Sequence, residues 1–156
     1  MGLKATIFGF IRNLLIERPA KKQTLGQLAD NLEKDGNKIE QKIAQKADSE
    51  HNRNKLIHII GIERWGQSRL KVALGEPFVL DEYDGYSPPA NSSWNELRAD
   101  FHRTRESTVA LGRELAKANI SPSTTIRHND FGEMSTHGWL RYLNFHANQE
   151  SKGIKE

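Results

Sequence analysis

The sequence predicts an all-α protein: a four-helix bundle with a long crossover between helices two and three, preceded by a short N-terminal helix. Apolar residues recur at helical spacing in four long segments, and capping residues precede these segments. No stretch of useful length alternates apolar and polar residues as a strand would. A chain of 156 residues suits one domain. We divide it into an N-terminal amphipathic segment, residues 1–19, and a bundle domain, residues 20–156.

The composition excludes several classes of function. The 23 Lys and Arg and the 20 Asp and Glu are interleaved, so no basic stripe favours nucleic-acid binding. The absence of cysteine excludes disulfides, thiolate zinc sites and a cysteine nucleophile. No apolar run reaches the roughly 18 residues that a membrane span needs. We expect a cytoplasmic protein, because Glu17-Arg18-Pro19 stands where a secretory signal would have small residues.

Residues 3–17 form an amphipathic segment, which we expect to end at Pro19 because proline cannot continue a helix. The segment can pack on the bundle or on the partner of a homodimer, which is the assembly that we expect. The alternative is an anchor on a membrane surface, although the polar face is short of Lys and Arg for that role.

The first two long helices are predicted at residues 24–46 and 50–74. Thr24 and Gln27 form a capping-box pattern, and Gly36 interrupts the apolar face in a way that a close helix contact would explain. Asp48 or Ser49 caps the second helix. Its middle is apolar almost all round, which marks a buried helix, through Leu56, Ile57, Ile59, Ile60, Ile62 and Trp65.

A connection over residues 75–92 is long for a bundle, so helices two and three are expected to run parallel. The third helix spans residues 93–119, with Ser93 and Glu96 as a second capping box and an apolar seam behind them. After an irregular stretch over residues 121–134, the fourth helix begins at Ser135 or Thr136.

Ionisable residues at apolar positions indicate a candidate metal site. His146 and Glu150 lie one turn apart on the apolar stripe of the fourth helix, and His58 lies in the apolar run of the second. Burial of such groups costs several kcal/mol unless they are paired or bind metal. Two His and one Glu can hold zinc with an open position, and nickel, iron or manganese fit the same ligands. The alternative for His58 is a hydrogen-bonded core residue, and Glu63 either supports a ligand His or pairs with an Arg.

Two segments resemble the DinB/YfiT-like superfamily. Residues 58–65 (HIIGIERW) are similar to its helix-two signature, and residues 127–134 (RHNDFGEM) with 138–146 (GWLRYLNFH) are similar to its approach to helix four. The resemblance covers about residues 20–156. Many members carry a metal held by one His of helix two and two His of helix four. His58 and His146 match the first two ligands, whereas Glu150 stands where the third His would be. The carboxylate either completes an altered site or marks a degenerate one.

The resemblance implies a thiol-dependent transferase that uses a divalent metal, zinc or nickel, and a low-molecular-weight thiol such as bacillithiol or mycothiol. The metal would bind the thiol and lower its pKa. Four residues are implied around the mouth of a small pocket: Arg127, His128, Trp139 and Tyr142. The alternative function is a non-catalytic protein that binds a small ligand or serves in stress, with a degenerate metal site.

Overall fold

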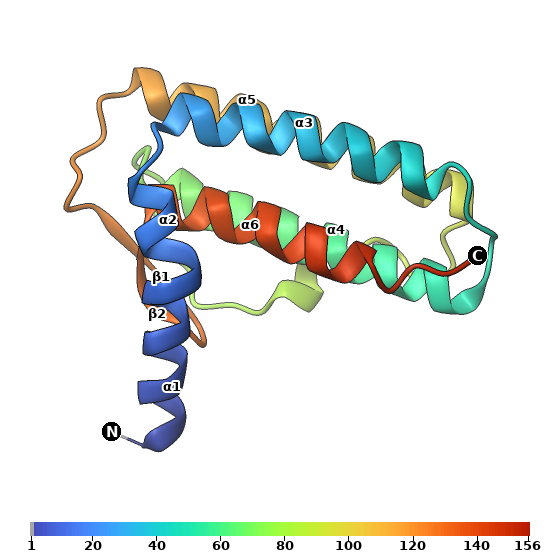
Figure 1. Ribbon diagram of the computed structural model, residues 1–156, viewed down its shortest axis with the longest axis horizontal. Coiled ribbons are helices and arrows are strands. Elements are labelled where there is room, and N and C mark those ends of the chain that lie inside the picture. The colour runs from blue at the N-terminus through green and yellow to red at the C-terminus, as the bar shows by residue number, and fades with distance from the viewer. Residues whose placement is uncertain (1) are drawn as a thin grey trace.

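The computed structural model describes residues 2–156, and the chain is mostly helical with one small two-stranded sheet (Figure 1). The elements in chain order are α1 (Leu3–Ile11), a π-helical segment η1 (Arg12–Glu17), α2 (Arg18–Lys21), α3 (Leu25–Ile43), α4 (Glu50–Val72), a 3₁₀ turn η2 (Tyr83–Tyr86), α5 (Trp94–Lys117), β1 (Thr125–His128), β2 (Gly132–Ser135) and α6 (Thr136–Ser151).

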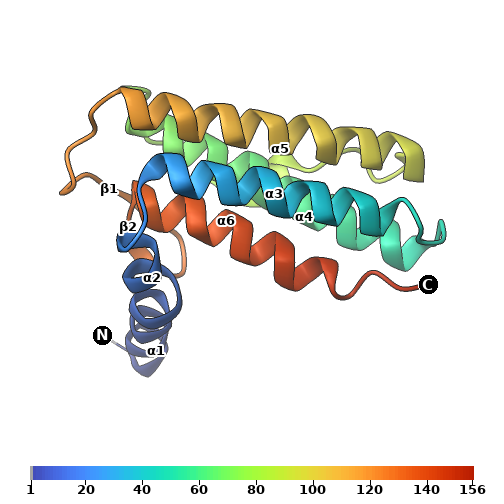
Figure 2. The same ribbon diagram turned by 45° about the horizontal axis from the view of Figure 1, so that its top comes forward.

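The four long helices lie side by side (Figures 1 and 2), with α3 and α4 each in contact with both α5 and α6. Helices α4 and α5 run in the same direction, and the connection between them returns along the length of the helices rather than across their end. Two apolar clusters fill the interior, one around Trp65 and Trp139 and the other around Phe101 and Leu56. Among the described residues, no helix is long and apolar enough to cross a membrane.

Local capping signals determine where the long helices begin. The side chains of Thr24 and Ser93 form the two predicted capping boxes, and Ser49 and Ser135 cap α4 and α6. The predicted carboxyl ends lie two or three residues too far along the chain. At the end of α5, Asn119 has a φ of 52°, in the left-handed region where a helix stops.

The expectation of an all-α chain needs one correction, because β1 and β2 form an antiparallel hairpin in which Thr125 pairs with Ser135. Each strand has four residues, too short to show a convincing alternation in the sequence. The hairpin is stabilised on its inner face, where Ile126 and Met134 pair and are both buried. The positive φ of Gly132 allows the turn that returns the chain.

The prediction that Pro19 ends the N-terminal segment is wrong, because the chain stays helical to Lys21. Proline has no N–H to donate to the carbonyl of Leu15, four residues earlier. Instead, Nε of Arg141 on α6 donates to that carbonyl oxygen at 2.9 Å. The π-helical segment η1 before Pro19 is wider than an α-helix, because its backbone hydrogen bonds join residues five positions apart. A tertiary contact thus replaces the hydrogen bond that the proline removes.

The prediction of a close helix contact at Gly36 is confirmed. A Cβ at this position of α3 would lie 2.6 Å from Cγ of Arg105 on α5. Only glycine therefore allows the long Arg105 side chain to pass between the two helices and reach the interior.

Candidate metal centre

The structure brings His58, His146 and Glu150 together. His58 lies on α4, and the other two lie one turn apart on α6. One potential ligand atom from each residue lies within 4.8 Å of the others. The two Nε2 atoms of the histidines are 3.2 Å apart. All three residues are partly buried, so the group lies at the edge of the helix interface rather than in its centre.

The separation of the two histidine nitrogens fits coordination of one metal ion by both of them. Two nitrogens bound to tetrahedral zinc at about 2.05 Å are roughly 3.3 Å apart, close to the 3.2 Å observed between His58 and His146. The same distance also fits a direct hydrogen bond in which one neutral ring donates and the other accepts. The backbone therefore holds the two rings where an ion could take the place of one proton.

Both rings are neutral at neutral pH. Burial, and then the neighbouring His58, lower the pKa of His146 to about 4. Burial also lowers the pKa of His58, although the carboxylate of Glu150 acts in the opposite direction. Metal ligation requires the neutral imidazole. The local environment thus keeps both histidines in the form that binds metal.

Glu150 is held by a cation of the protein itself. Nζ of Lys55 lies 3.0 Å from Oε2 of Glu150, and both side chains are about one-third exposed. Burial alone would raise the pKa of Glu150, but the hydrogen bond from Lys55 and the nearby His146 bring it below its usual range. The Glu150 carboxylate is therefore ionised and turned toward an ammonium group. Lys55 was not anticipated from the sequence, although its position three residues before His58 places it on the same face of α4.

Two tyrosine rings border the histidine pair. The ring of Tyr83 in η2 lies 5.2 Å from that of His58, and the ring of Tyr142 on α6 lies 6.0 Å from that of His146. Tyr142 is buried, which raises the pKa of its hydroxyl. Tyr83 is 37% exposed and belongs to the long connection. The connection, which we did not expect to contribute to the site, therefore supplies part of its wall.

Specific contacts fix that connection against α4. Asp81 accepts hydrogen bonds from Nε1 of Trp65 at 3.1 Å and from the hydroxyl of Tyr86 at 2.6 Å. A Cβ on Gly61 would lie 2.6 Å from Oγ of Ser87, so this glycine lets the connection approach the helix near His58. These contacts hold η2, and with it Tyr83, beside the histidine pair.

Three of the four residues implied for the pocket mouth are buried in an aromatic cluster. The ring of His128 lies 5.2 Å from that of Trp139 and 4.8 Å from that of Tyr142. Trp139 donates its indole N–H to the carbonyl of Ile126 at 2.9 Å. Arg127 lies on the outer face of β1 and is exposed. The structure therefore packs His128, Trp139 and Tyr142 against one another, with the Tyr142 ring next to that of His146. It does not bring Arg127 to them.

His128 is a neutral residue that orders the hairpin turn. Its Nδ1 accepts hydrogen bonds from the backbone N–H groups of Asp130 and Phe131 at 3.1 and 3.2 Å. Burial, followed by the charge of Arg69, lowers its pKa to about 3. Because Nδ1 is the acceptor, the proton of the neutral ring is on Nε2, which lies among aromatic rings. Nδ1 of His128 thus has a structural role in the turn, whereas the buried Nε2 has no hydrogen-bond partner among the described residues.

Glu63 forms a buried ion pair with Arg105, the second of the alternatives considered for it. The guanidinium donates two hydrogen bonds to the carboxylate, at 2.7 and 3.0 Å, and the Thr108 hydroxyl adds a third at 2.8 Å. Arg105 also donates to the carbonyl of Leu32 and to Asn144. This network ties α4 to α5, α3 and α6 and leaves Glu63 fully partnered.

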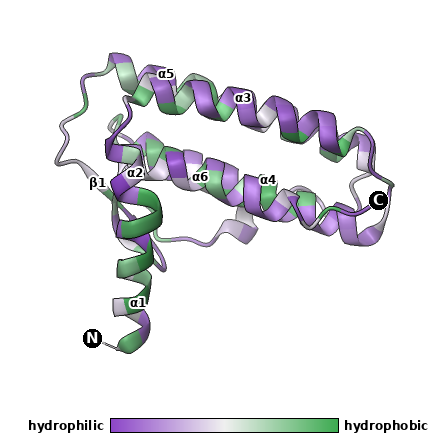
Figure 3. Cartoon of the chain, in the orientation of Figure 1, coloured by the Kyte–Doolittle hydropathy of each residue, from purple (hydrophilic) through white to green (hydrophobic). Residues whose placement is uncertain are grey.

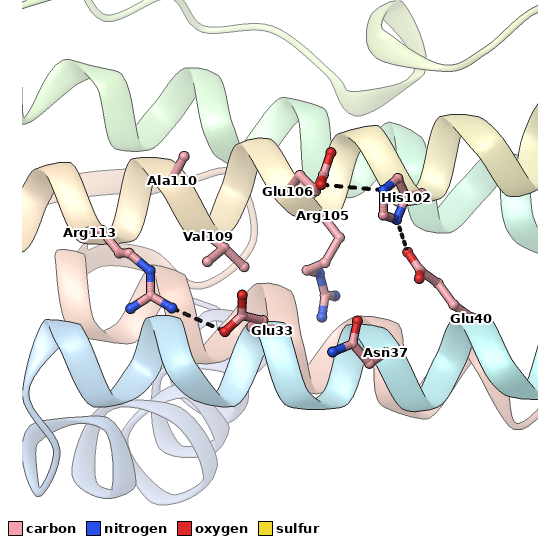
Figure 4. A pocket seen from close by; sticks show the side chains of 9 residues that line it. All are labelled: Glu33, Asn37, Glu40, His102, Arg105, Glu106, Val109, Ala110 and Arg113. Atoms are coloured by element: carbon pink, nitrogen blue, oxygen red, sulfur yellow. Dashed lines mark hydrogen bonds and ion pairs between the residues drawn. The ribbon is translucent and has the colours of Figure 1, made fainter.

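A separate hollow of about 320 Å³ lies between α3 and α5 (Figure 4). His102 on its rim bonds Glu40 and Glu106, and Arg113 bonds Glu33. The hydrogen bond that His102 donates to the Glu40 carboxylate is the main reason that the pKa of His102 is raised. Apart from Arg105, which pairs with the buried Glu63, the charged side chains on this hollow pair with one another, so the arrangement points to stabilisation of the α3–α5 contact and not to a ligand.

No protein-family model matches the chain, and no curated protein or solved structure shows significant similarity to it. The function is therefore argued from the residues that the fold brings together. Of these, His58, His146 and Glu150 form the group whose chemistry points most directly to a ligand.

Proposed function

We propose that the protein binds one divalent transition-metal ion, zinc in the first place, through Nε2 of His58, Nε2 of His146 and the carboxylate of Glu150. The observation that carries the proposal is the 3.2 Å separation of two neutral imidazole nitrogens with a carboxylate oxygen within 4.8 Å. Two His and one Glu are a recurrent ligand set of catalytic zinc, with the fourth position open to water or substrate.

The carboxylate must move for the ion to bind. Glu150 now faces Lys55, and tetrahedral coordination would bring its oxygen to roughly 3.3 Å from each histidine nitrogen. Zinc would replace the ammonium of Lys55 as the cation beside Glu150. Lys55, released from Glu150, could then pair with an anionic group of a ligand.

For the activity, we propose a thiol-dependent transfer reaction on a DinB-like four-helix bundle. A bound zinc ion lowers the pKa of a thiol or water in its open position. The residues of the chain would orient that ligand: Tyr83 on the side of the connection and Lys55 on the side of α4. Partial exposure of all three metal ligands supports access from solvent. The proposal includes a cytoplasmic homodimer that binds a low-molecular-weight thiol.

A non-catalytic protein with a degenerate site is the second candidate. It is favoured by the fact that 3.2 Å also suits a hydrogen bond between His58 and His146. The ion pair between Lys55 and Glu150 already satisfies the carboxylate without metal. In this alternative the site would be a polar contact between α4 and α6, and any small ligand would bind without chemistry.

Metal analysis of protein purified without a His-tag separates the two candidates. After loading with zinc and dialysis, we expect about one equivalent in the wild-type protein and below about 0.1 equivalent in His58→Ala. His102→Ala is the matched control, because His102 is a surface histidine bonded to Glu40 and should leave the zinc content unchanged. Less than about 0.1 equivalent in the wild type would contradict the metal site.

A further inference from the structure

The N-terminal arm, residues 2–22, carries an exposed apolar stripe. Leu3, Ile7, Phe10 and Leu14 follow a spacing of four, three and four, and their exposed fractions lie between 46% and 78%. Figure 3 shows α1 as a largely hydrophobic helix that projects away from the long helices. Scattered exposed apolar residues are ordinary, but four on one face of a projecting helix mark a surface that meets a partner.

The opposite face of the arm fixes its orientation. The ring of Phe8 lies 5.6 Å from that of Phe131 in the hairpin turn, and Arg12 donates to the Phe131 carbonyl at 2.9 Å. Further along, Ile16 and Ala20 are buried. The arm is therefore attached to the fold by one face, and the apolar stripe is directed outward by those contacts.

The exposed charges of the arm are all positive. Lys4, Arg18, Lys21 and Lys22 are exposed, and the last three follow residues 3–17, the segment whose polar face is short of Lys and Arg. Glu17 is the one acidic residue of this segment in the sequence, and it is buried, accepting hydrogen bonds from the backbone N–H and the hydroxyl of Ser135. The arm thus presents apolar side chains together with cations, and no exposed anion.

A cationic hollow adjoins the stripe. It measures about 500 Å³ and is lined by Leu14, Arg18, Pro19, Lys22, Gln23 and Arg141. Its charged members are two guanidinium groups and one ammonium group, without a carboxylate to neutralise them. Nε of Arg141 is used on the Leu15 carbonyl, which holds that side chain in place. Guanidinium groups bind phosphate oxygens with favourable geometry.

We propose that the arm binds an anionic membrane surface, with the apolar stripe entering the interface and the hollow of Arg18, Lys22 and Arg141 receiving a lipid phosphate. Charge complementarity selects this partner. A second copy of the arm would bring cations against cations, because the segment offers no exposed acidic residue to face Lys4 or Arg18. An apolar face flanked by cations on a helix that lies in the interface is typical of peripheral membrane association. The inference does not depend on metal binding.

Co-sedimentation of the full-length protein with vesicles tests the proposal at low salt. Vesicles of phosphatidylcholine are compared with vesicles that also contain phosphatidylserine. We expect binding to the anionic vesicles at least about 10-fold tighter than to the neutral ones, and weaker binding as salt rises. The double variant Phe10→Glu/Leu14→Glu should lose binding through the stripe, and Arg18→Glu/Lys22→Glu should lose it through the hollow.

Matched controls change the same chemistry elsewhere on the surface. Val79→Glu/Leu80→Glu replaces two exposed apolar residues of the long connection, and Lys34→Glu/Lys71→Glu reverses two exposed cations of α3 and α4. Both controls should keep most of the binding, and circular dichroism checks that every variant is folded. Equal losses in the arm variants and the controls would overturn the proposal, because the attraction would then be one of general charge and hydrophobicity.

Three further outcomes would also overturn it. The first is absence of binding to anionic vesicles at low salt. The second is a wild-type dimer, measured by light scattering, that Phe10→Glu/Leu14→Glu converts to a monomer, because the stripe would then belong to a second copy. The third is binding of soluble glycerol phosphate, detected by calorimetry, without binding to vesicles, because the hollow would then serve a free phosphate ester.

Discussion

Two ionisable residues five positions apart on α4, His58 and Glu63, lie in the same apolar run and have opposite surroundings. Glu63 is 1% exposed, and Arg105 and Thr108 satisfy its carboxylate with three hydrogen bonds. His58 is partly exposed, and its hydrogen-bond partner is a second neutral histidine, His146. A buried charge with complete partners has no need of a further ligand, whereas two neutral nitrogens that face one another beside a carboxylate form a site that a cation can complete.

The largest effect is expected at the complete network. Arg105→Met leaves the carboxylate of Glu63 buried without a counter-charge, which should lower the free energy of unfolding by about 3–5 kcal/mol. Urea denaturation measures the loss. The double variant Glu63→Leu/Arg105→Met removes both charges and should recover most of it. If the single variant loses less than about 1 kcal/mol, Arg105 is not the counter-charge that the buried Glu63 requires.

Zinc should stabilise the protein through His58, His146 and Glu150, and it should have no effect through the network of Glu63 and Arg105. At a free zinc concentration 100 times the dissociation constant, the free energy of unfolding should rise by about 2.7 kcal/mol. Thermal denaturation with and without zinc should show this gain in the wild type and in His102→Ala, and should not show it in His146→Ala. The metal-free His146→Ala protein provides the baseline. A gain of equal size in His146→Ala would mean that zinc binds elsewhere.

The pH dependence of the free energy of unfolding of the metal-free protein should be due to the histidines. The pKa of His146 is lowered to about 4 in the folded chain, against about 6.5 when unfolded. Between these two values the unfolded chain binds more protons, so stability should be highest above about pH 6.5 and should fall as the pH drops toward 4. Urea titrations in the presence of a chelator measure this slope. His146→Gln should flatten part of it, leaving the contributions of the other histidines whose pKa is lowered, His58, His128 and His137. An unchanged slope would exclude His146 as its cause.

Glu150, the proposed third ligand, can be exchanged for the histidine that the resemblance implies. Glu150→His keeps a metal-binding side chain one turn from His146, so zinc affinity should be retained or increased. Isothermal titration calorimetry measures the dissociation constant. Loss of zinc binding in this variant would mean that Glu150 is not a ligand and that its carboxylate serves the pair with Lys55.

The smallest effect concerns Lys55. Because the Lys55–Glu150 pair is partly exposed, its loss should be worth about 1 kcal/mol or less. Lys55→Met should therefore tighten zinc binding by about fivefold or less, since the ion no longer competes with the ammonium for Glu150. Lys38→Met removes one lysine charge on α3, where its ion pair with Asp35 is longer and more exposed, and is the control for a change of net charge. Weaker zinc binding in Lys55→Met would mean that Lys55 assists the metal instead of competing with it.

The sequence predicted what local signals encode. Thr24 and Ser93 form the predicted capping boxes and Ser49 is the cap of the two candidates offered for α4, because capping depends on residues within one turn. Gly36 correctly signalled a close approach between helices. The extension of the helix past Pro19 escaped prediction, because it depends on Arg141, a residue 122 positions away in the chain whose side chain reaches the Leu15 carbonyl.

The candidate site was predictable in its parts but not in its surroundings. His58, His146 and Glu150 were chosen as polar residues at apolar helical positions, and the structure brings them within ligand distance of one another. Tyr83 could not be placed beside them, because the path of the long connection is set by tertiary contacts such as that of Asp81 with Trp65. The choice between the two alternatives for Glu63 likewise depended on Arg105 from another helix.

The most direct test of the metal centre is a cobalt titration of tag-free protein, followed by visible absorption. We expect intense bands of four-coordinate Co²⁺ that saturate at one equivalent, and that zinc abolishes by displacement. The bands should be lost in His58→Ala and His146→Ala and retained in His102→Ala. The weak spectrum of hydrated Co²⁺ in the wild-type protein, unchanged by either histidine substitution, would contradict the assignment.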